Sequence, residues 1–104
     1  MTIVETAVFS RQIDRPLDRE SYRRLQLELA DDPKRGPVIP RSGGLRKIRW
    51  EGSGRGKRGG IRVIYWVARE DLLLMLLAYP KNVQDDLTQD QLRALRQIVE
   101  RELT

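Results

Sequence analysis

Apolar and polar residues alternate at the start of the chain. Residues 2–9 (TIVETAVF) show this alternation and are rich in β-branched types. A period of two with β-branched residues is typical of a strand, so the sequence predicts one here, with Ile3 and Phe9 pointing inward. Residues 11–16 predict a short helical turn that stops at the final proline, because the residue before a proline disfavours the α conformation.

The next pattern is helical and has a clear start. Asp18 is a good N-cap residue, and Leu17 and Tyr22 flank the first turn as a hydrophobic staple. Tyr22 and Leu29 then share one face at helical spacing. The sequence therefore predicts a helix from Asp18 to about residue 30.

A second helix is predicted at the C-terminal end. Thr88 and Gln91 form the capping box T-x-x-Q, and Leu87 and Leu92 form its staple. The apolar residues that follow fall on a single stripe and predict one buried face. They are Leu92, Leu95, Ile98, Val99 and Leu103.

Three strands are predicted between the two helices, at residues 44–50, 61–67 and 72–79. Each is a short run bounded by glycine-rich or turn-forming sequence. Residues 33–44 hold three prolines and three glycines, which indicates a loop. The run at 72–79 (LLLMLLAY) is apolar on both faces, which predicts a central strand covered on both sides.

The first of these three strands has two chemically different faces. Its period of two places Lys47 and Arg49 on one face and Ile48 and Trp50 on the other. The apolar face is expected to pack inward. The basic face is then left for another purpose.

The predicted order of elements is strand, helix, three strands, helix. This order indicates an α+β fold, in which a small, mostly antiparallel sheet packs against the N-terminal and C-terminal helices, most simply on one side. At 104 residues the chain is the size of one domain, so we expect a single domain over residues 1–104.

Composition narrows the possible chemistry. The chain contains no cysteine and no histidine. Disulfides, the usual zinc sites and the Ser-His and Cys-His catalytic arrangements are therefore excluded, and we expect no metal or other cofactor. Any acid–base step must use lysine, arginine, tyrosine, aspartate or glutamate.

The positive charge is concentrated in one segment. Residues 41–67 hold eight basic residues and one acidic residue, a net charge of +7, whereas the rest of the chain carries −2. A basic patch on a nearly neutral body is typical of a protein that binds a polyanion, most often a nucleic acid. The longest apolar run is far shorter than the roughly 20 residues of a membrane span, and no signal peptide is visible, so a cytoplasmic protein with no membrane partner is expected.

Residues 51–60 (EGSGRGKRGG) form a basic, glycine-rich hairpin loop. The spacing G-x-G-x-x-G occurs there, but no helix follows, so a dinucleotide site is not indicated. Taken alone, the loop fits two interpretations about equally: a hairpin tip with solvated charges, or a site for an RNA backbone. The second is favoured once Lys47, Arg49 and Arg62 on the adjacent strands are considered with it.

Three motifs in this order and spacing resemble the RelE/ParE superfamily, and within it the HigB-type toxins. The motifs are GGLRKIRW, GRGKRGGIRVIYW and AYPKNVQDDLT. The resemblance covers nearly the whole chain. It implies a compact fold with a curved sheet and a metal-independent endonuclease that cuts messenger RNA in the ribosomal A site. It also implies that a small antitoxin neutralises the protein, and for a HigB-type toxin this partner is expected to be a helix-turn-helix DNA-binding protein.

The resemblance also assigns roles to individual residues. The catalytic residues it implies are Lys57, Arg62 and Lys81. The RNA-binding residues it implies are Lys47, Arg49, Arg55 and Arg58.

The expected mechanism is attack of the RNA 2′-hydroxyl on the neighbouring phosphate, which gives a 2′,3′-cyclic product. Arg62 and Lys81 would stabilise the added negative charge of the transition state. Lys57 or Lys47 could serve as base only with a pKa well below the ordinary value of about 10.4. Some members of the superfamily carry a tyrosine a few residues after the last basic position, where this chain reads Asp85-Asp86-Leu87. Two alternatives are open: Tyr79 or Tyr65 replaces it, or this subgroup does without a tyrosine.

Two other interpretations remain open from the sequence. One is a ParE-like toxin that poisons DNA gyrase, and the other is an RNA-binding module without enzymatic activity. Of the remaining polar residues, Asp85 and Asp86 are interpreted as charges at a helix N-terminus rather than a metal pair. Trp50 and Trp66 are interpreted as aromatic residues that cover the sheet rather than as platforms for RNA bases.

Overall fold

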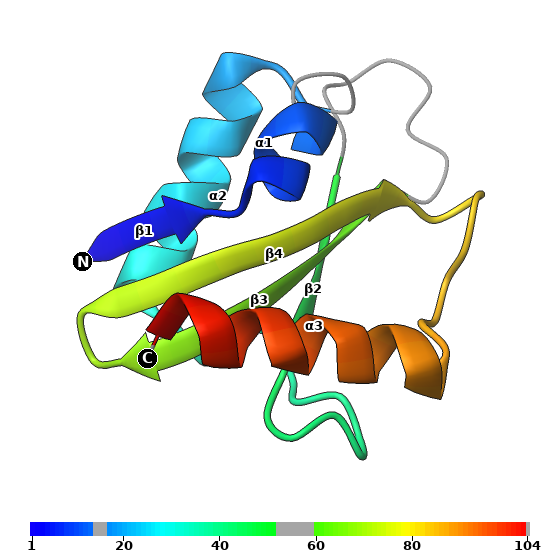
Figure 1. Ribbon diagram of the computed structural model, residues 1–104. Coiled ribbons are helices and arrows are strands. Elements are labelled where there is room, and N and C mark those ends of the chain that lie inside the picture. Colours follow the sequence, from blue (N-terminus) through cyan, green and yellow to red (C-terminus); the bar gives the residue numbers. More distant parts are fainter. Residues whose placement is uncertain (14–16, 52–59, 104) are drawn as a thin grey trace.

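The computed structural model describes residues 1–13, 17–51 and 60–103. They form an α+β fold of three helices and four strands (Figure 1). The elements in chain order are β1 (Thr2–Glu5), α1 (Ala7–Ile13), α2 (Arg19–Asp31), β2 (Arg46–Trp50), β3 (Ile61–Arg69), β4 (Leu72–Pro80) and α3 (Gln89–Leu103). Within these described ranges, no helix is long and apolar enough to cross a membrane.

The four strands form one mixed sheet in the order β1-β4-β3-β2. β3 pairs with β2 on one side and with β4 on the other, and both pairings are antiparallel. β1 runs parallel to its neighbour β4. The predicted α+β class and mostly antiparallel sheet are therefore confirmed. Strands β2, β3 and β4 also fall where the sequence predicted them, except that β2 begins at Arg46 and β3 continues to Arg69.

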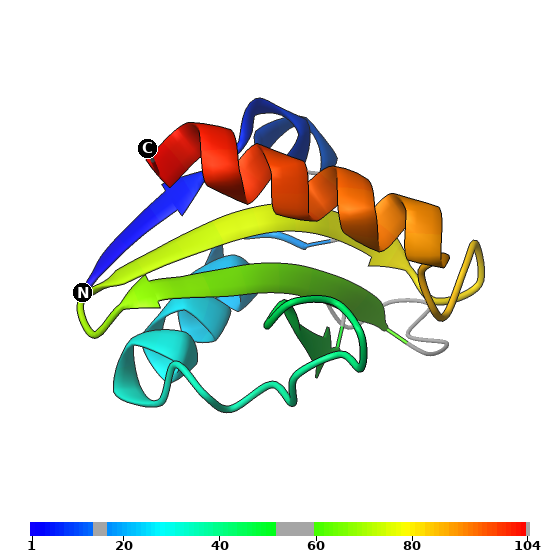
Figure 2. The ribbon, with the colours of Figure 1, turned by 60° about the horizontal axis from the view of Figure 1, so that its bottom comes forward.

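Helices cover both faces of the sheet, so the expectation that they pack on one side was wrong. Figure 2 shows α3 on one face and α2 on the other. Leu73 and Met75 of β4 belong to the core under α1 and α2, whereas Leu74 and Leu76 belong to the core under α3. A strand that is apolar on both faces has to be covered twice, as the prediction of a central strand at residues 72–79 already required.

The N-terminal segment departs from its prediction after the first strand. β1 ends at Glu5, and helix α1 occupies positions that were assigned to a strand and a later turn. The Thr6 side-chain oxygen accepts a hydrogen bond from the Phe9 backbone N–H at 3.1 Å, and its hydroxyl donates to the Leu76 carbonyl. This local cap turns the chain into a helix, and Phe9 and Ile13 reach the core at helical spacing.

The two predicted helix starts are confirmed. The Asp18 side chain accepts a hydrogen bond of 2.8 Å from the Ser21 backbone N–H, and Leu17 beside it is buried. At the start of α3, the Gln91 N–H donates to the Thr88 hydroxyl oxygen and the Thr88 N–H donates to the Gln91 side chain. Both helices therefore satisfy otherwise unpaired backbone N–H groups with short polar side chains.

Thr88→Ala should lower the free energy of unfolding by about 1 kcal/mol, because the variant loses the cap of α3. Urea denaturation followed by circular dichroism measures this change. Gln97→Ala, on the exposed surface of the same helix, is the matched control and should change the value by no more than about 0.5 kcal/mol. Equal losses in the two variants would contradict a capping role for Thr88.

Candidate functional site

Strand pairing brings three basic residues onto one face of the sheet. Arg49 of β2 lies directly opposite Arg62 of β3, and Lys47 lies two residues along from Arg49. Ile48, between them in sequence, is buried in the core on the other face. The predicted division of β2 into a basic and an apolar face is confirmed, and the basic face is the one that α3 partly covers.

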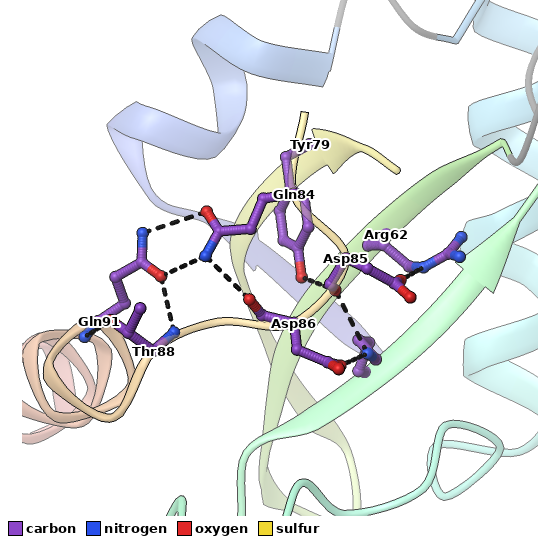
Figure 3. Close-up of polar contacts among 8 residues, drawn as sticks. Arg62, Tyr79, Gln84, Asp85, Asp86, Thr88 and Gln91 are labelled. Carbon is purple, nitrogen blue, oxygen red and sulfur yellow. Dashed lines mark hydrogen bonds and ion pairs between the residues drawn. The ribbon is translucent and has the colours of Figure 1, made fainter. Parts of the chain in front are cut away.

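The segment between β4 and α3 places two carboxylates on these basic side chains (Figure 3). Asp85 Oδ1 lies 2.9 Å from Arg62 Nε, and Asp86 Oδ1 lies 2.7 Å from Lys47 Nζ. The Arg62 side chain is only 4% exposed, whereas those of Asp85 and Asp86 are 47% and 84% exposed. The cations are thus fixed within the fold, and the anions lie over them on its surface.

Asp85 is the centre of this polar network. Its backbone carbonyl accepts hydrogen bonds from the Tyr79 hydroxyl at 3.1 Å and from Lys47 Nζ at 3.4 Å (Figure 3). The hydrogen bond from the Arg62 guanidinium holds the pKa of the Asp85 carboxyl below its usual range. Asp85 therefore stays ionised at neutral pH and keeps its pairing with Arg62.

Of the two candidate tyrosines, only Tyr79 lies in this network. Its Cα is paired with that of Arg62 across β3 and β4. Burial, reinforced by the negative charge of Asp86, raises the pKa of Tyr79 to about 12, so its hydroxyl keeps its proton at neutral pH. Tyr79 can therefore act as a hydrogen-bond or proton donor, and a general base is the role that this environment disfavours.

Tyr65 serves the fold on the opposite face of the sheet. Its ring is fully buried in the core under α2. Its hydroxyl donates to the Pro33 carbonyl and accepts from the Gly36 N–H, both at 2.8 Å. The Tyr65 side chain is thereby separated from Arg62 by the sheet itself.

A hollow with a volume of about 250 Å³ adjoins the ion pairs. Lys47, Tyr79 and Asp86 line one part of it, and Ile39 and Leu92 are among the apolar residues that line the rest. The site therefore combines charged groups with an apolar recess, an arrangement that suits a ligand with both phosphate and flat apolar parts.

The remaining predicted site residues lie at the same end of the sheet or outside the described residues. Lys81 follows β4 and is exposed, and its backbone N–H donates to the Gly60 carbonyl. Gly60 has φ +59°, and a Cβ there would lie 2.3 Å from the Trp50 carbonyl oxygen, so only glycine fits. Arg55, Lys57 and Arg58 fall within residues 52–59, which lie outside the described residues.

Sequence reasoning missed the role of Asp85 and Asp86. The interpretation as helix N-terminal charges was wrong, because α3 begins at Gln89 and both carboxylates pair with sheet cations. Their partners are 23 and 39 positions away in sequence, so no local motif could have revealed them. Among residues 1–13, 17–51 and 60–103, no group of three potential acidic, histidine or cysteine ligands could hold a metal ion.

Both tryptophans cover the sheet, as interpreted from the sequence. The Trp50 indole N–H donates to the Ser21 hydroxyl oxygen at 3.1 Å, which joins β2 to α2. Trp66 packs against the core on the α3 face, and the Arg96 guanidinium lies 4.6 Å from its ring centroid. These contacts place the two rings within the packing between sheet and helices.

Comparison with known protein families identifies a match over the region that contains the site. The sequence model described as the RelE toxin of the RelE/RelB toxin–antitoxin system matches residues 38–104. The matched region covers well over half of the chain. It contains β2, β3, β4, α3 and every residue of the polar network around Asp85.

Proposed function

The chain belongs to the RelE toxin family, and on that premise we propose that it is a metal-independent endonuclease that cuts messenger RNA on the ribosome. Membership of the family makes the protein the toxin of a toxin–antitoxin system, with a cognate antitoxin as its partner. The proposal extends this to the target, the reaction and the residues that perform it. It also includes a HigB-type subgroup, one toxin domain over residues 1–104, a helix-turn-helix antitoxin and a cytoplasmic location.

The observation that carries the proposal is the convergence of Lys47, Arg49 and Arg62 on one sheet face beside Tyr79. Cations on adjacent strands repel one another, so their gathering has to be offset by a counter-charge. In the structure two carboxylates supply that charge. An RNA backbone would supply it equally well, since each phosphate carries one negative charge.

In the proposed reaction, the 2′-hydroxyl oxygen attacks the adjacent phosphorus and the bond to the 5′-oxygen breaks. Arg62 and Lys81 stabilise the negative charge that builds up on the phosphate oxygens. Tyr79, which keeps its proton at neutral pH, is proposed to protonate the leaving 5′-oxygen. Lys57 is proposed to accept the proton of the 2′-hydroxyl, with Lys47 as the alternative base.

The other basic residues are assigned to binding. Lys47 and Arg49 hold phosphates that flank the cleaved bond, together with Arg55 and Arg58. Because the chain has no histidine, its acid–base groups are poorly matched to neutral pH. Orientation of the messenger RNA by the ribosome then accounts for much of the rate, which is why the proposed activity depends on the ribosome.

The test is primer extension on a reporter messenger RNA incubated with the wild-type protein, with and without translating ribosomes. Cleavage that appears only with ribosomes is the expected result. Intact messenger RNA in both reactions, together with inhibition of DNA gyrase, would contradict the proposal and favour a gyrase poison. Intact messenger RNA with RNA binding alone would favour a binding module.

Lys47→Ala should weaken binding of a short single-stranded RNA by about three- to tenfold, because one phosphate contact is lost. The slope of log Kd against log salt should decrease by about 0.7. Fluorescence anisotropy with a 2′-O-methyl oligonucleotide, which lacks the attacking hydroxyl, measures binding without cleavage. Arg23→Ala, on helix α2 across the sheet, removes the same charge and should change the affinity far less.

A further inference from the structure

Arg62 is buried where an RNA-binding residue has to be accessible. Its side chain is 4% exposed, and the carboxylate of Asp85 lies against its Nε. Lys47 is 16% exposed and has the Asp86 carboxylate at 2.7 Å. In this arrangement two of the cations proposed to contact RNA, the catalytic Arg62 and the binding residue Lys47, are already occupied by acidic groups of the same chain.

Carboxylate and phosphate groups make equivalent contacts with such cations. Both present anionic oxygens that accept charge-assisted hydrogen bonds from arginine and lysine at about 2.7–2.9 Å. The observed distances of 2.9 Å for Arg62 and 2.7 Å for Lys47 fall in that range. A phosphate at either cation would therefore take the place that a carboxylate oxygen now holds.

We propose that Asp85 and Asp86 form an acidic latch that covers Arg62 and Lys47 and that RNA phosphates displace when they bind. The inference rests on the proposed function, because it assigns a form of regulation to the same site. The closed structure is the state of the free protein. The open state has phosphates on both cations and the segment 81–86 moved outward.

The latch is attached weakly enough to open. When a phosphate replaces each carboxylate, Arg62 and Lys47 exchange one anionic partner for another, so opening leaves neither cation without a counter-charge. Both carboxylates are largely exposed, and Val83, the one large apolar residue of the segment between Lys81 and Asp86, is 73% exposed. Little apolar surface therefore has to be uncovered when the segment leaves Arg62.

The latch is also attached firmly enough at one end to close again. The Gln84 side chain donates to the Asp86 carbonyl at 2.8 Å and to the Gln91 side chain at 2.7 Å (Figure 3). Gln91 belongs to the first turn of α3 and completes its capping box. The segment thus has a fixed hinge at the helix start, and its two carboxylates remain at high local concentration near their cations.

The alternative is that Asp85 only positions Arg62 for RNA. The two ideas predict opposite effects of removing the carboxylates. If Asp85 positions Arg62, its loss weakens RNA binding. If it blocks Arg62, its loss strengthens RNA binding.

The test compares the double variant Asp85→Asn, Asp86→Asn with Asp71→Asn, Asp90→Asn as the matched control. Asp71 and Asp90 form ion pairs with the exposed Arg69 and Arg93 rather than with Arg62 or Lys47, and both double variants raise the net charge by the same amount. Binding of the 2′-O-methyl oligonucleotide is measured by fluorescence anisotropy. Reactivity of Arg62 toward phenylglyoxal is measured by peptide mass spectrometry without RNA.

The latch predicts about tenfold tighter binding by the Asp85/Asp86 variant and a severalfold faster modification of Arg62. The control variant should bind within about twofold of the wild type. Equal affinities of the two double variants, weaker binding by the Asp85/Asp86 variant, or an unchanged modification rate at Arg62 would each overturn the latch.

These outcomes are separate from the fate of the proposed function, because neither readout requires cleavage. Tighter binding with no cut messenger RNA in a translating system would support the latch and reject the endonuclease. Ribosome-dependent cleavage by the wild type, with no gain in RNA affinity in the Asp85/Asp86 variant, would keep the endonuclease and reject the latch.

Discussion

Replacing Arg62 by alanine should lower the rate of ribosome-dependent messenger RNA cleavage by about 100- to 1,000-fold. Arg62 is held within the fold next to Tyr79 and carries the charge proposed to stabilise the pentacoordinate phosphate. Loss of one group that stabilises a developing anionic charge commonly reduces a rate by this amount. Primer extension with ribosomes, followed over time at saturating toxin, measures the effect on the rate rather than on binding.

Arg69→Ala is the matched control for this experiment. It removes the same side chain from the other end of β3, where Arg69 pairs with Asp71 and is largely exposed. Circular dichroism of both variants checks that the fold is retained, and Arg62→Lys tests whether a charge without the planar guanidinium restores part of the rate. Cleavage by folded Arg62→Ala at the wild-type rate would remove Arg62 from the catalytic site.

Tyr65→Phe should lower the free energy of unfolding by about 1–3 kcal/mol. The Tyr65 hydroxyl bonds both the Gly36 N–H and the Pro33 carbonyl under α2. Phenylalanine fills nearly the same volume but leaves those backbone groups without this partner, and unsatisfied buried polar groups carry a penalty of that size. Urea denaturation of wild type and variant measures the difference.

Tyr22→Phe is the control, because it also removes a tyrosine hydroxyl from the α2 side of the sheet. The Tyr22 hydroxyl donates to Glu5, a half-buried carboxylate that water can reach, so a smaller loss is expected. The cleavage rate per folded molecule should be unchanged in Tyr65→Phe, since Tyr65 lies across the sheet from Arg62. A stable Tyr65→Phe protein with impaired cleavage would instead make Tyr65 the functional tyrosine.

Local signals in the sequence are sufficient to predict most elements of the fold. Asp18 and Thr88 mark the starts of the two longer helices because capping depends on a few neighbouring residues. The alternation around Ile48 predicts the two faces of β2 because a strand has a period of two. The same alternation is enough to place Lys47 and Arg49 together on one of those faces.

Each of the two main unpredicted features includes a contact between distant segments. Thr6 ends β1 and caps α1 while its hydroxyl bonds the Leu76 carbonyl, which is 70 positions away in sequence. The pairing of Arg62 with Asp85 requires β4 and the following turn to fold back beside β3. Sequence patterns identify the basic half of the site, but only the three-dimensional fold shows that acidic residues cover it.

The parallel pairing of β1 with β4 imposes an order on folding. Thr2 lies opposite Leu72 and Glu5 opposite Met75, so β1 cannot be paired until the chain has been synthesised through β4, about 70 residues later. Contacts of such high sequence separation form late, because a long loop must be closed before they contribute. The hairpin of β3 and β4 needs only local contacts and is expected to form the early nucleus, with β1 added afterwards. A nascent toxin therefore completes its sheet only after β4 has been synthesised, although β1 is made first.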